Sequence, residues 1–318
     1  MEFVFVAVGL VILILAGDSL VKGAVSLSLK LGVPALIVSV TIVGFGTSAP
    51  EMLIAIQSAL KGAPGIALGN VVGSNTANVL LVLGVPALIY AMDTGGSDTR
   101  RIYLMMMGVS VIFVALAFMG PFYIWHGFVL LALLAVMLGD NLYCALRSRN
   151  NGNGVDIDVL AEIEDADPHM ATWKMWAYII AGIIGLPIGA QLMIDGAVVI
   201  ADRFGLSEEV IGLTLVAIGT SLPELATTVM AAIRRQAAVA LGNVIGSNMF
   251  NLLAIMGVAS FFGPIPVAPE FLTFHFWVML GSSALVGLFV FTRLSITRIW
   301  GIAFLALYVV YIVQLLHR

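Results

Sequence analysis

The chain has 318 residues, of which 61% are hydrophobic and only 10% are charged, and its formal net charge is −4. Soluble globular proteins are about half apolar and about one quarter charged, so this composition excludes a soluble globular domain. The single cysteine, Cys144, excludes an internal disulfide, and the sequence contains no phosphate-binding loop motif and no H-E-x-x-H zinc motif.

Apolar stretches of about the length that a helix needs to cross a bilayer recur along the whole chain. They lack the two-residue alternation of barrel strands, so we predict an all-α membrane protein. The first stretch has no basic region ahead of it and is expected to be retained rather than cleaved as a signal peptide. The ten expected transmembrane helices cover residues 2–20, 34–60, 66–92, 102–119, 122–146, 174–200, 207–233, 237–262, 271–291 and 296–316.

The basic residues are distributed unevenly between the connections of these helices. If the N-terminus lies outside, eleven of the fourteen lysines and arginines fall in cytoplasmic segments, and only Lys61, Arg203 and Arg318 fall outside. Positively charged residues are enriched in cytoplasmic loops, so this bias predicts that both termini lie outside.

An internal repeat organises the chain. Residues 46–51 read GTSAPE and residues 219–224 read GTSLPE, an offset of 173, and the same offset carries LGNVVGSNTAN (68–78) onto LGNVIGSNMFN (241–251). From Gly46 to Gly84, 17 of 39 positions are identical to their partners. Each copy holds five expected helices, an odd number, so the second copy enters the membrane from the opposite side. Inverted repeats of this kind carry their binding sites near the middle of the membrane.

The repeat predicts three parts of the chain. Residues 1–146 form a first five-helix repeat with its motif at 44–84, and residues 172–318 form a second with its motif at 217–257. Residues 147–171 form a cytoplasmic linker that is acidic between positions 156 and 167. The acids lack the D-x-D-x-D-G spacing of a calcium loop, so we interpret the linker as a solvated connector.

Two carboxylates fall inside the apolar stretches, at Glu51 and Glu224. An ionisable side chain at the bilayer centre costs about 2.5–3.5 kcal/mol, which favours a functional role over simple helix packing. Thr47 shares a helical face with Glu51. The next expected helix carries one polar stripe, and the second copy repeats the whole arrangement. The stripe and its repeat are Asn70, Ser74 and Asn78, then Asn243, Ser247 and Asn251.

The chemistry of this set points to a cation. Every side chain in it offers oxygen and none offers sulfur or imidazole, which is the ligand preference of hard cations such as Na+ and Ca2+. Pro50 and Pro223 also leave the carbonyls of Gly46 and Gly219 without helical donors. The G-x-x-x-G pairs at 69–73 and 242–246 are interpreted as close helix packing. Asp18 and Lys22, four residues apart, are expected to pair within one helix.

The doubled motifs GTSAPE…GNVVGSNTAN and GTSLPE…GNVIGSNMFN resemble the α-1 and α-2 repeats of the cation/calcium antiporter superfamily, the sodium/calcium exchangers and their prokaryotic relatives. The resemblance covers nearly the whole chain. It implies an integral protein of the prokaryotic cytoplasmic (inner) membrane, in which the first and sixth helices slide across a core that holds four central ion sites. It implies no enzyme activity, no cofactor and no nucleic-acid partner.

The resemblance also assigns roles position by position. It implies that Glu51 and Glu224 are the central carboxylates and that Asn78 and Asn251 complete the equatorial positions. Thr47 and Thr220 supply backbone carbonyls to a calcium site. The outer sodium sites are implied to use four serines and two backbone carbonyls, namely Ser48, Ser74, Ser221 and Ser247 with Gly44 and Ala217.

One position departs from the family pattern. Well-known sodium/calcium exchangers carry an aspartate where this chain has Asn251, so the site here holds two carboxylates and no third. Two negative charges balance one Ca2+, two Na+ or two H+, whereas three Na+ would leave the site positive. This disfavours the exchange of three Na+ for one Ca2+ that is usual in the family. Exchange of Ca2+ for Na+ is therefore the expected function, and Ca2+/H+ exchange, or exchange of another divalent cation, stays open as the alternative.

Two functions from other classes fit the sequence less well. An intramembrane protease is not supported, because LGDN (138–141) has no second aspartate in a matching context and the intramembrane serines have no matched histidine. A membrane scaffold without transport would show no cation-dependent change in stability.

Overall fold

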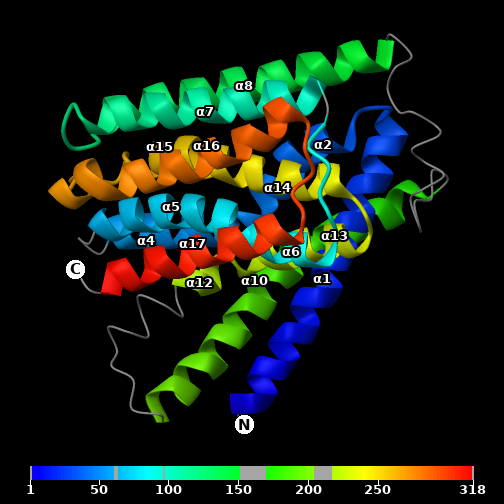
Figure 1. Ribbon diagram of the computed structural model, residues 1–318, viewed down its shortest axis with the longest axis horizontal. Coiled ribbons are helices and arrows are strands. Elements are labelled where there is room, and N and C mark those ends of the chain that lie inside the picture. The colour runs from blue at the N-terminus through cyan, green and yellow to red at the C-terminus, as the bar shows by residue number, and fades with distance from the viewer. Residues whose placement is uncertain (1, 61–63, 96, 151–169, 204–216, 317–318) are drawn as a thin grey trace.

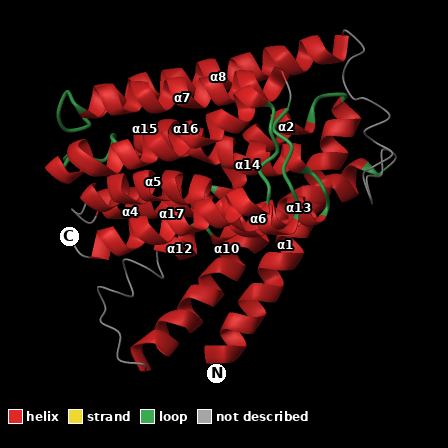
Figure 2. Cartoon of the chain, viewed as in Figure 1, coloured by secondary structure: helices red, strands yellow, loops and turns green. Residues whose placement is uncertain are grey.

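The computed structural model describes residues 2–60, 64–95, 97–150, 170–203 and 217–316. In this part of the chain the regular structure is helical, and two isolated β-bridges, Met92 with Ile296 and Phe122 with Ile265, tie loops together (Figure 2). Most of the predicted linker 147–171 lies outside the described residues.

Within the described residues, eight helices are long and apolar enough to cross a membrane, or nine if a bent pair is counted as one span. The protein is therefore an all-helical membrane protein. The seventh expected helix, 207–233, is described only from residue 217 onward. The eight spans are Glu2–Leu31, Pro64–Ile89, Asp98–Ala117, Ile124–Arg147, Thr172–Gly196, Ala237–Ala259, Phe271–Thr292 and Arg298–Leu315, and the bent pair joins Ala35–Thr47 to Ala49–Leu60.

The helices of the two halves correspond at the 173-residue offset found in the sequence. In the first half they are α1 (Glu2–Leu31), α2 (Ala35–Val38), η1 (Ser39–Val43), α3 (Gly44–Thr47), α4 (Ala49–Leu60), α5 (Pro64–Ala77), η2 (Asn78–Val82), α6 (Gly84–Ile89), α7 (Ser97–Ala117) and α8 (Ile124–Asn150). In the second they are α10 (Thr172–Arg203), α12 (Ala217–Thr220), α13 (Leu222–Ile233), α14 (Ala237–Phe250), η4 (Asn251–Ile255), α15 (Met256–Ala259), η5 (Phe271–His275), α16 (Phe276–Thr292) and α17 (Arg298–Leu316). The bounds of α3, α4, α5 and η2 reappear at the offset in α12, α13, α14 and η4.

The helices that carry the motifs are interrupted, whereas the sequence predicted continuous helices there. The first is bent by 43° between α3 and α4. The break falls at Ser48, with φ −82° and ψ 5°, and its partner Ser221 has nearly the same angles, φ −85° and ψ 4°. Each break lies two residues before a proline, which has no amide hydrogen for the helical ladder. The helices that follow then widen into π turns beginning at Asn78 and at Asn251.

The arrangement places the motif helices at the centre of the molecule. Figure 1 shows α7 and α8 along one edge and α1 with α10 at the opposite edge, with α5 and α14 between them. The most apolar stretch of the span formed by α14, η4 and α15 is buried throughout, whereas only a minority of the residues in the corresponding stretches of α8 and α17 are buried. Lipid favours apolar helices at the outside of the molecule. The helices that carry the polar motif residues, α5 and α14, accordingly lie at its centre.

Helices α1 and α10, which correspond at the repeat offset, pack against each other along much of their length (Figure 1). Glycine makes this approach possible: a Cβ added at Gly9 would lie 2.7 Å from the carbonyl oxygen of Gly189, and one at Gly182 would lie 2.9 Å from the Cα of Leu20. Since early residues of α1 meet late residues of α10, the two helices run antiparallel.

Ion pairs form within one helix and between helices. The predicted pair of Asp18 and Lys22 is confirmed, at 3.2 Å. Asp18 Oδ1 also accepts a hydrogen bond from Nε of Arg234, the residue that follows α13, at 2.6 Å. On the other side of the molecule, Arg101 of α7 pairs with Asp140 of α8.

Candidate ion-binding site

The two glutamates occupy equivalent places, each in the first turn of the helix that follows a break. Glu51 lies in α4 and Glu224 in α13, and both side chains are fully buried. Their carboxylates are close enough for the two charges to repel each other. The repeat therefore brings together two acidic residues that are 173 positions apart in the chain.

Hydroxyl groups from both halves surround the Glu224 carboxylate. Ser48 Oγ donates to Glu224 Oε1 at 3.3 Å. The hydroxyls of Thr47 and Ser247 lie close to the same carboxylate and to each other, 3.1 Å apart. The backbone carbonyl of Gly44 accepts from Thr47 Oγ1 at 3.4 Å and from Ser247 Oγ at 3.5 Å. Three of the expected site residues, Thr47, Ser48 and Ser247, thus converge on Glu224.

Asn243 ties the two halves together at this point. Its Oδ1 accepts from Thr47 Oγ1 at 3.1 Å, and its Nδ2 donates to the backbone oxygen of Glu224 at 3.2 Å. Thr228 Oγ1 donates to the same backbone oxygen at 2.6 Å. The sequence placed Asn243 in the polar stripe, but it offered no means of pairing Asn243 with Thr47.

The remaining expected residues are also buried where they are described. Ser74, Asn78, Asn251, Thr220 and Ser221 are each at most 5% exposed. Ala217 begins α12, and its side chain lies outside the described set. The expected site residues therefore occupy buried positions on α3, α4, α5, η2, α12, α13, α14 and η4.

Several buried oxygens in this region have no hydrogen-bond donor among the described residues. They are Glu51 Oε1 and Oε2, Glu224 Oε2, Asn78 Oδ1, Asn251 Oδ1 and Ser221 Oγ. A buried oxygen without a partner costs about 1–3 kcal/mol, and more if it is charged. Carboxylate, amide and hydroxyl oxygens are the ligands that hard cations such as Na+ and Ca2+ prefer, so the donor set fits a hard cation.

Other metal chemistries fit this region poorly. Among the described residues no three His, Cys, Asp or Glu side chains converge. Zinc and copper sites use imidazole or thiolate ligands, which this region lacks. The site is built from carboxylate, amide, hydroxyl and backbone oxygens.

Two further asparagines, to which the sequence motifs assign no role, lie directly beside the expected ligands. Asn75 and Asn248 are each 1% exposed and hydrogen-bond to Asn251 and Asn78. They are identical at the repeat offset, which is a signal in the sequence. They lie beside the predicted stripe rather than on it, so helical periodicity did not identify them.

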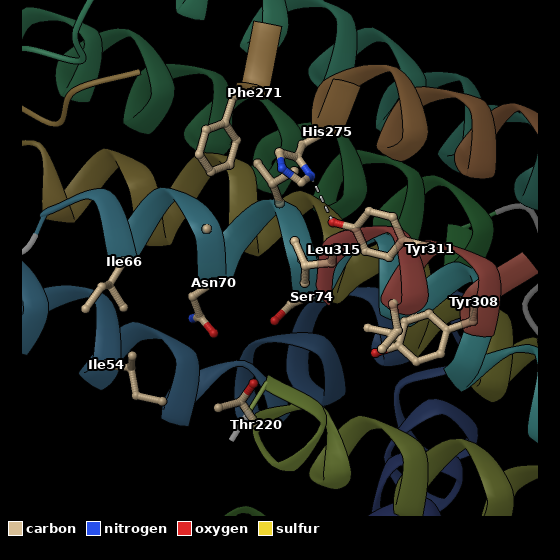
Figure 3. Close-up of a pocket in the computed structure, with 14 residues that line it drawn as sticks. Ile54, Ile66, Asn70, Ser74, Thr220, Phe271, His275, Tyr308, Tyr311 and Leu315 are labelled. Carbon is tan, nitrogen blue, oxygen red and sulfur yellow. Dashed lines mark hydrogen bonds between the residues drawn. The ribbon is translucent and has the colours of Figure 1, made fainter. Parts of the chain in front are cut away.

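A cavity of about 310 Å³ lies against one side of this region (Figure 3). One wall is lined by Asn70, Ser74 and Thr220. The opposite wall contains His275 and Tyr311, with His275 Nδ1 3.3 Å from the Tyr311 hydroxyl oxygen. The cavity therefore reaches two of the residues that the sequence placed in the ion site, Ser74 and Thr220.

A buried oxygen cluster built on broken helices, inside an all-helical membrane protein with an internal repeat, is the architecture of a secondary transporter. The family model described as "Sodium/calcium exchanger protein" matches residues 1–139 and 174–316, so the chain belongs to that family. The protein is thus a member of an exchanger family and not an enzyme.

Similar proteins cover nearly the whole chain. Sodium/calcium exchanger MaX1 of Methanosarcina acetivorans is 32% identical over 99% of both chains, and inner membrane protein YrbG of Escherichia coli is 32% identical over 90% of this chain and 87% of its own. A structure of the sodium-calcium exchanger NCX_Mj, soaked with zero Na+ and Ca2+, superimposes with a TM-score of 0.82 at 32% identity, covering 99% of this chain and 98% of its own.

Proposed function

We propose that this protein is a secondary antiporter that exchanges Ca2+ for Na+ across the membrane by alternating access. The observation that carries the proposal is the pair of buried carboxylates, Glu51 and Glu224, with three carboxylate oxygens that no described group satisfies. The relatives support the same cargo, since MaX1 is named a sodium/calcium exchanger. Crystals of NCX_Mj were soaked with Na+ and Ca2+ and with Na+ and Sr2+.

The proposed ligands follow the geometry of the region. Glu51 and Glu224 bind the divalent cation, and Asn78 and Asn251 contribute their amide oxygens. The smaller monovalent sites use hydroxyl and backbone oxygens on either side of the carboxylates. The backbone carbonyls of Thr47 and Thr220 complete the divalent site. The monovalent sites are assigned to Ser48, Ser221, Ser74, Ser247, Gly44 and Ala217.

The proposed topology has ten crossings in two inverted halves, 1–146 and 172–318, joined by a cytoplasmic linker at 147–171. The coincident element bounds and the antiparallel packing of α1 against its partner α10 support inversion. Both termini then lie outside, and the E. coli relative, named an inner membrane protein, supports placement in the cytoplasmic membrane of a prokaryote.

The proposed coupling arises from charge. Two ionised carboxylates cannot stay unpaired in a closed, low-dielectric site, so the empty carrier resists the change between its two orientations. Binding of Ca2+, or of monovalent ions, neutralises the pair and permits the change. Because Ca2+ and the monovalent ions neutralise the same two carboxylates, they bind alternately, and exchange results.

Ca2+/H+ exchange is the second candidate, and the same two carboxylates favour it. Two protons neutralise Glu51 and Glu224 as completely as two Na+ ions do. The many hydroxyl oxygens around Glu224 support sodium, since protonated carboxylates would not need them.

The test is uptake of radioactive calcium into proteoliposomes under a clamped membrane voltage, driven first by a sodium gradient and then by a pH gradient. We expect uptake under the sodium gradient, and uptake under the pH gradient alone would replace sodium with protons. Glu51→Gln and Glu224→Gln serve as inactive references. Wild-type rates in either of these two variants would refute the proposed site.

A further inference from the structure

Four buried asparagines cross-link the two halves at the ion site, with the same pattern in each direction. Asn251 Nδ2 donates to Asn75 Oδ1 at 3.0 Å, and Asn78 Nδ2 donates to Asn248 Oδ1 at 3.1 Å. Asn75 and Asn248 correspond at the 173-residue offset, as do Asn78 and Asn251. An asparagine of each half therefore accepts a hydrogen bond from an asparagine of the other half.

Asn75 and Asn248 are the outer amides of this group, and Asn78 and Asn251 are the inner amides. Neighbouring acceptors determine which way the side-chain amides of Asn75 and Asn248 face. Asn75 Nδ2 donates to the backbone oxygen of Asn248 at 3.2 Å and lies 3.9 Å from Met279 Sδ. Asn248 Nδ2 lies 3.8 Å from Met106 Sδ, the residue that corresponds to Met279. Carbonyl oxygen and thioether sulfur accept but cannot donate, so the nitrogen of each outer amide must face them.

This orientation propagates to the inner amides. Because the nitrogens of Asn75 and Asn248 are turned outward, their oxygens face Asn251 and Asn78, and only an N–H group can satisfy an oxygen there. Asn251 and Asn78 must present their nitrogens to these oxygens. Their own oxygens are then turned away from the asparagine group, and both are buried without a donor among the described residues.

We infer that Asn75 and Asn248 are positioning residues that orient the amide oxygens of Asn251 and Asn78 toward the transported cation. The inference rests on the proposed function, in which these two oxygens are ligands. Without the outer amides, Asn78 or Asn251 is free to rotate by 180° and to present a partly positive N–H group to the cation. The arrangement also makes each half of the protein responsible for a ligand on the other.

The effect is expected in ion affinity. Removing a group that orients a metal ligand typically weakens metal affinity about 10- to 100-fold. Asn248 allows a clean comparison, because Asn248→Leu removes the acceptor whereas Asn248→Asp keeps an oxygen in the same place. The aspartate loses the distant contact with Met106 Sδ and adds a buried negative charge, which favours cation binding and does not weaken it.

The experiment titrates the purified full chain with Ca2+ alone and follows its melting temperature. We expect Asn248→Leu to need about 10- to 100-fold more Ca2+ for half-maximal stabilisation. Asn248→Asp should need no more than the wild type. Equal losses in the two variants, or a Leu variant that binds as the wild type does, would overturn the inference. If Asn248→Leu does not fold, Asn248→Ala takes its place with the same outcomes.

A double-mutant cycle separates positioning from general stability. If Asn248 acts through Asn78, then Asn248→Leu should weaken binding no further when Asn78→Ala is already present. An equal further loss in that background would show a merely structural role and refute the inference. If the wild type itself shows no stabilisation by Ca2+ or Na+, the proposed function fails. Stabilisation of the wild type with an unaffected Leu variant refutes the inference alone.

Discussion

Asp18 of α1 and Arg234, which follows α13, form an ion pair although they lie 216 positions apart in the chain. Arg234 Nε is 2.6 Å from Asp18 Oδ1. Both side chains are largely enclosed, at 16% exposure for Arg234 and 22% for Asp18. The pair joins the outer helix α1 to a core helix that carries Glu224. In the proposed alternating access, with sliding of α1 and α10, we expect this connection to break or to be remade.

Replacing Asp18 with asparagine should therefore change both stability and turnover. A hydrogen bond between charged groups contributes about 1.5–3 kcal/mol, so we expect Asp18→Asn to lower the melting temperature by several degrees. We also expect the calcium exchange rate to change several-fold while the concentration for half-maximal uptake stays nearly constant. Lys22→Gln is the matched control, because Lys22 meets Asp18 within α1 and such pairs contribute about 0.3–0.5 kcal/mol.

Glu51→Gln and Glu224→Gln should separate function from stability. Each removes one of two repelling buried charges, so the ion-free variants should melt at a higher temperature than the ion-free wild type. Calcium uptake should fall about 100-fold or more, as expected for loss of an interaction of about 3 kcal/mol. Glu270→Gln is the control, since Glu270 is exposed outside the site. A lower ion-free melting temperature in both site variants would contradict the idea of repulsion.

Gly246 and Gly108 should respond differently to alanine. A Cβ at Gly246 would lie 2.8 Å from the Cα of Val40, a backbone atom of η1 that cannot move independently. We expect Gly246→Ala to separate α14 from η1 and to abolish calcium uptake with a loss of several degrees in melting temperature. At Gly108 no described atom lies within 4 Å of the added Cβ. Gly108→Ala should be neutral or stabilise by about 0.5–1 kcal/mol, because alanine favours the helix.

Cations should stabilise the protein in an order set by ligand chemistry. Ca2+ at about 100 times its dissociation constant should add about 2.7 kcal/mol. Sr2+ should act similarly, since a flexible set of oxygens accepts large hard cations. Mg2+ should do less because it requires near-octahedral geometry at about 2.0–2.1 Å and sheds water reluctantly. Thermal melts with each chloride salt test this, and stabilisation by Zn2+ above that by Ca2+ would contradict an oxygen-only site.

The sequence alone was sufficient for the features that depend on composition and on local repetition. Lipid as the solvent follows from the apolar content, and the family follows from two motifs at a constant offset. The importance of Glu51 and Glu224 follows from the cost of placing any carboxylate in an apolar stretch. These inferences needed no knowledge of which helix touches which, because each concerns one segment or a comparison of two segments.

Only the tertiary structure revealed the contacts between the halves. The breaks at Ser48 and Ser221 turn predicted continuous helices into pairs of short ones. The pairing of Asn75 with Asn251, and of Asp18 with Arg234, depends on packing between helices that are distant in the chain. Helical periodicity identifies which residues share a face, but not which opposing face they meet. Amide orientation depends on every neighbouring donor and acceptor, and those neighbours are assembled only when the two halves fold against each other.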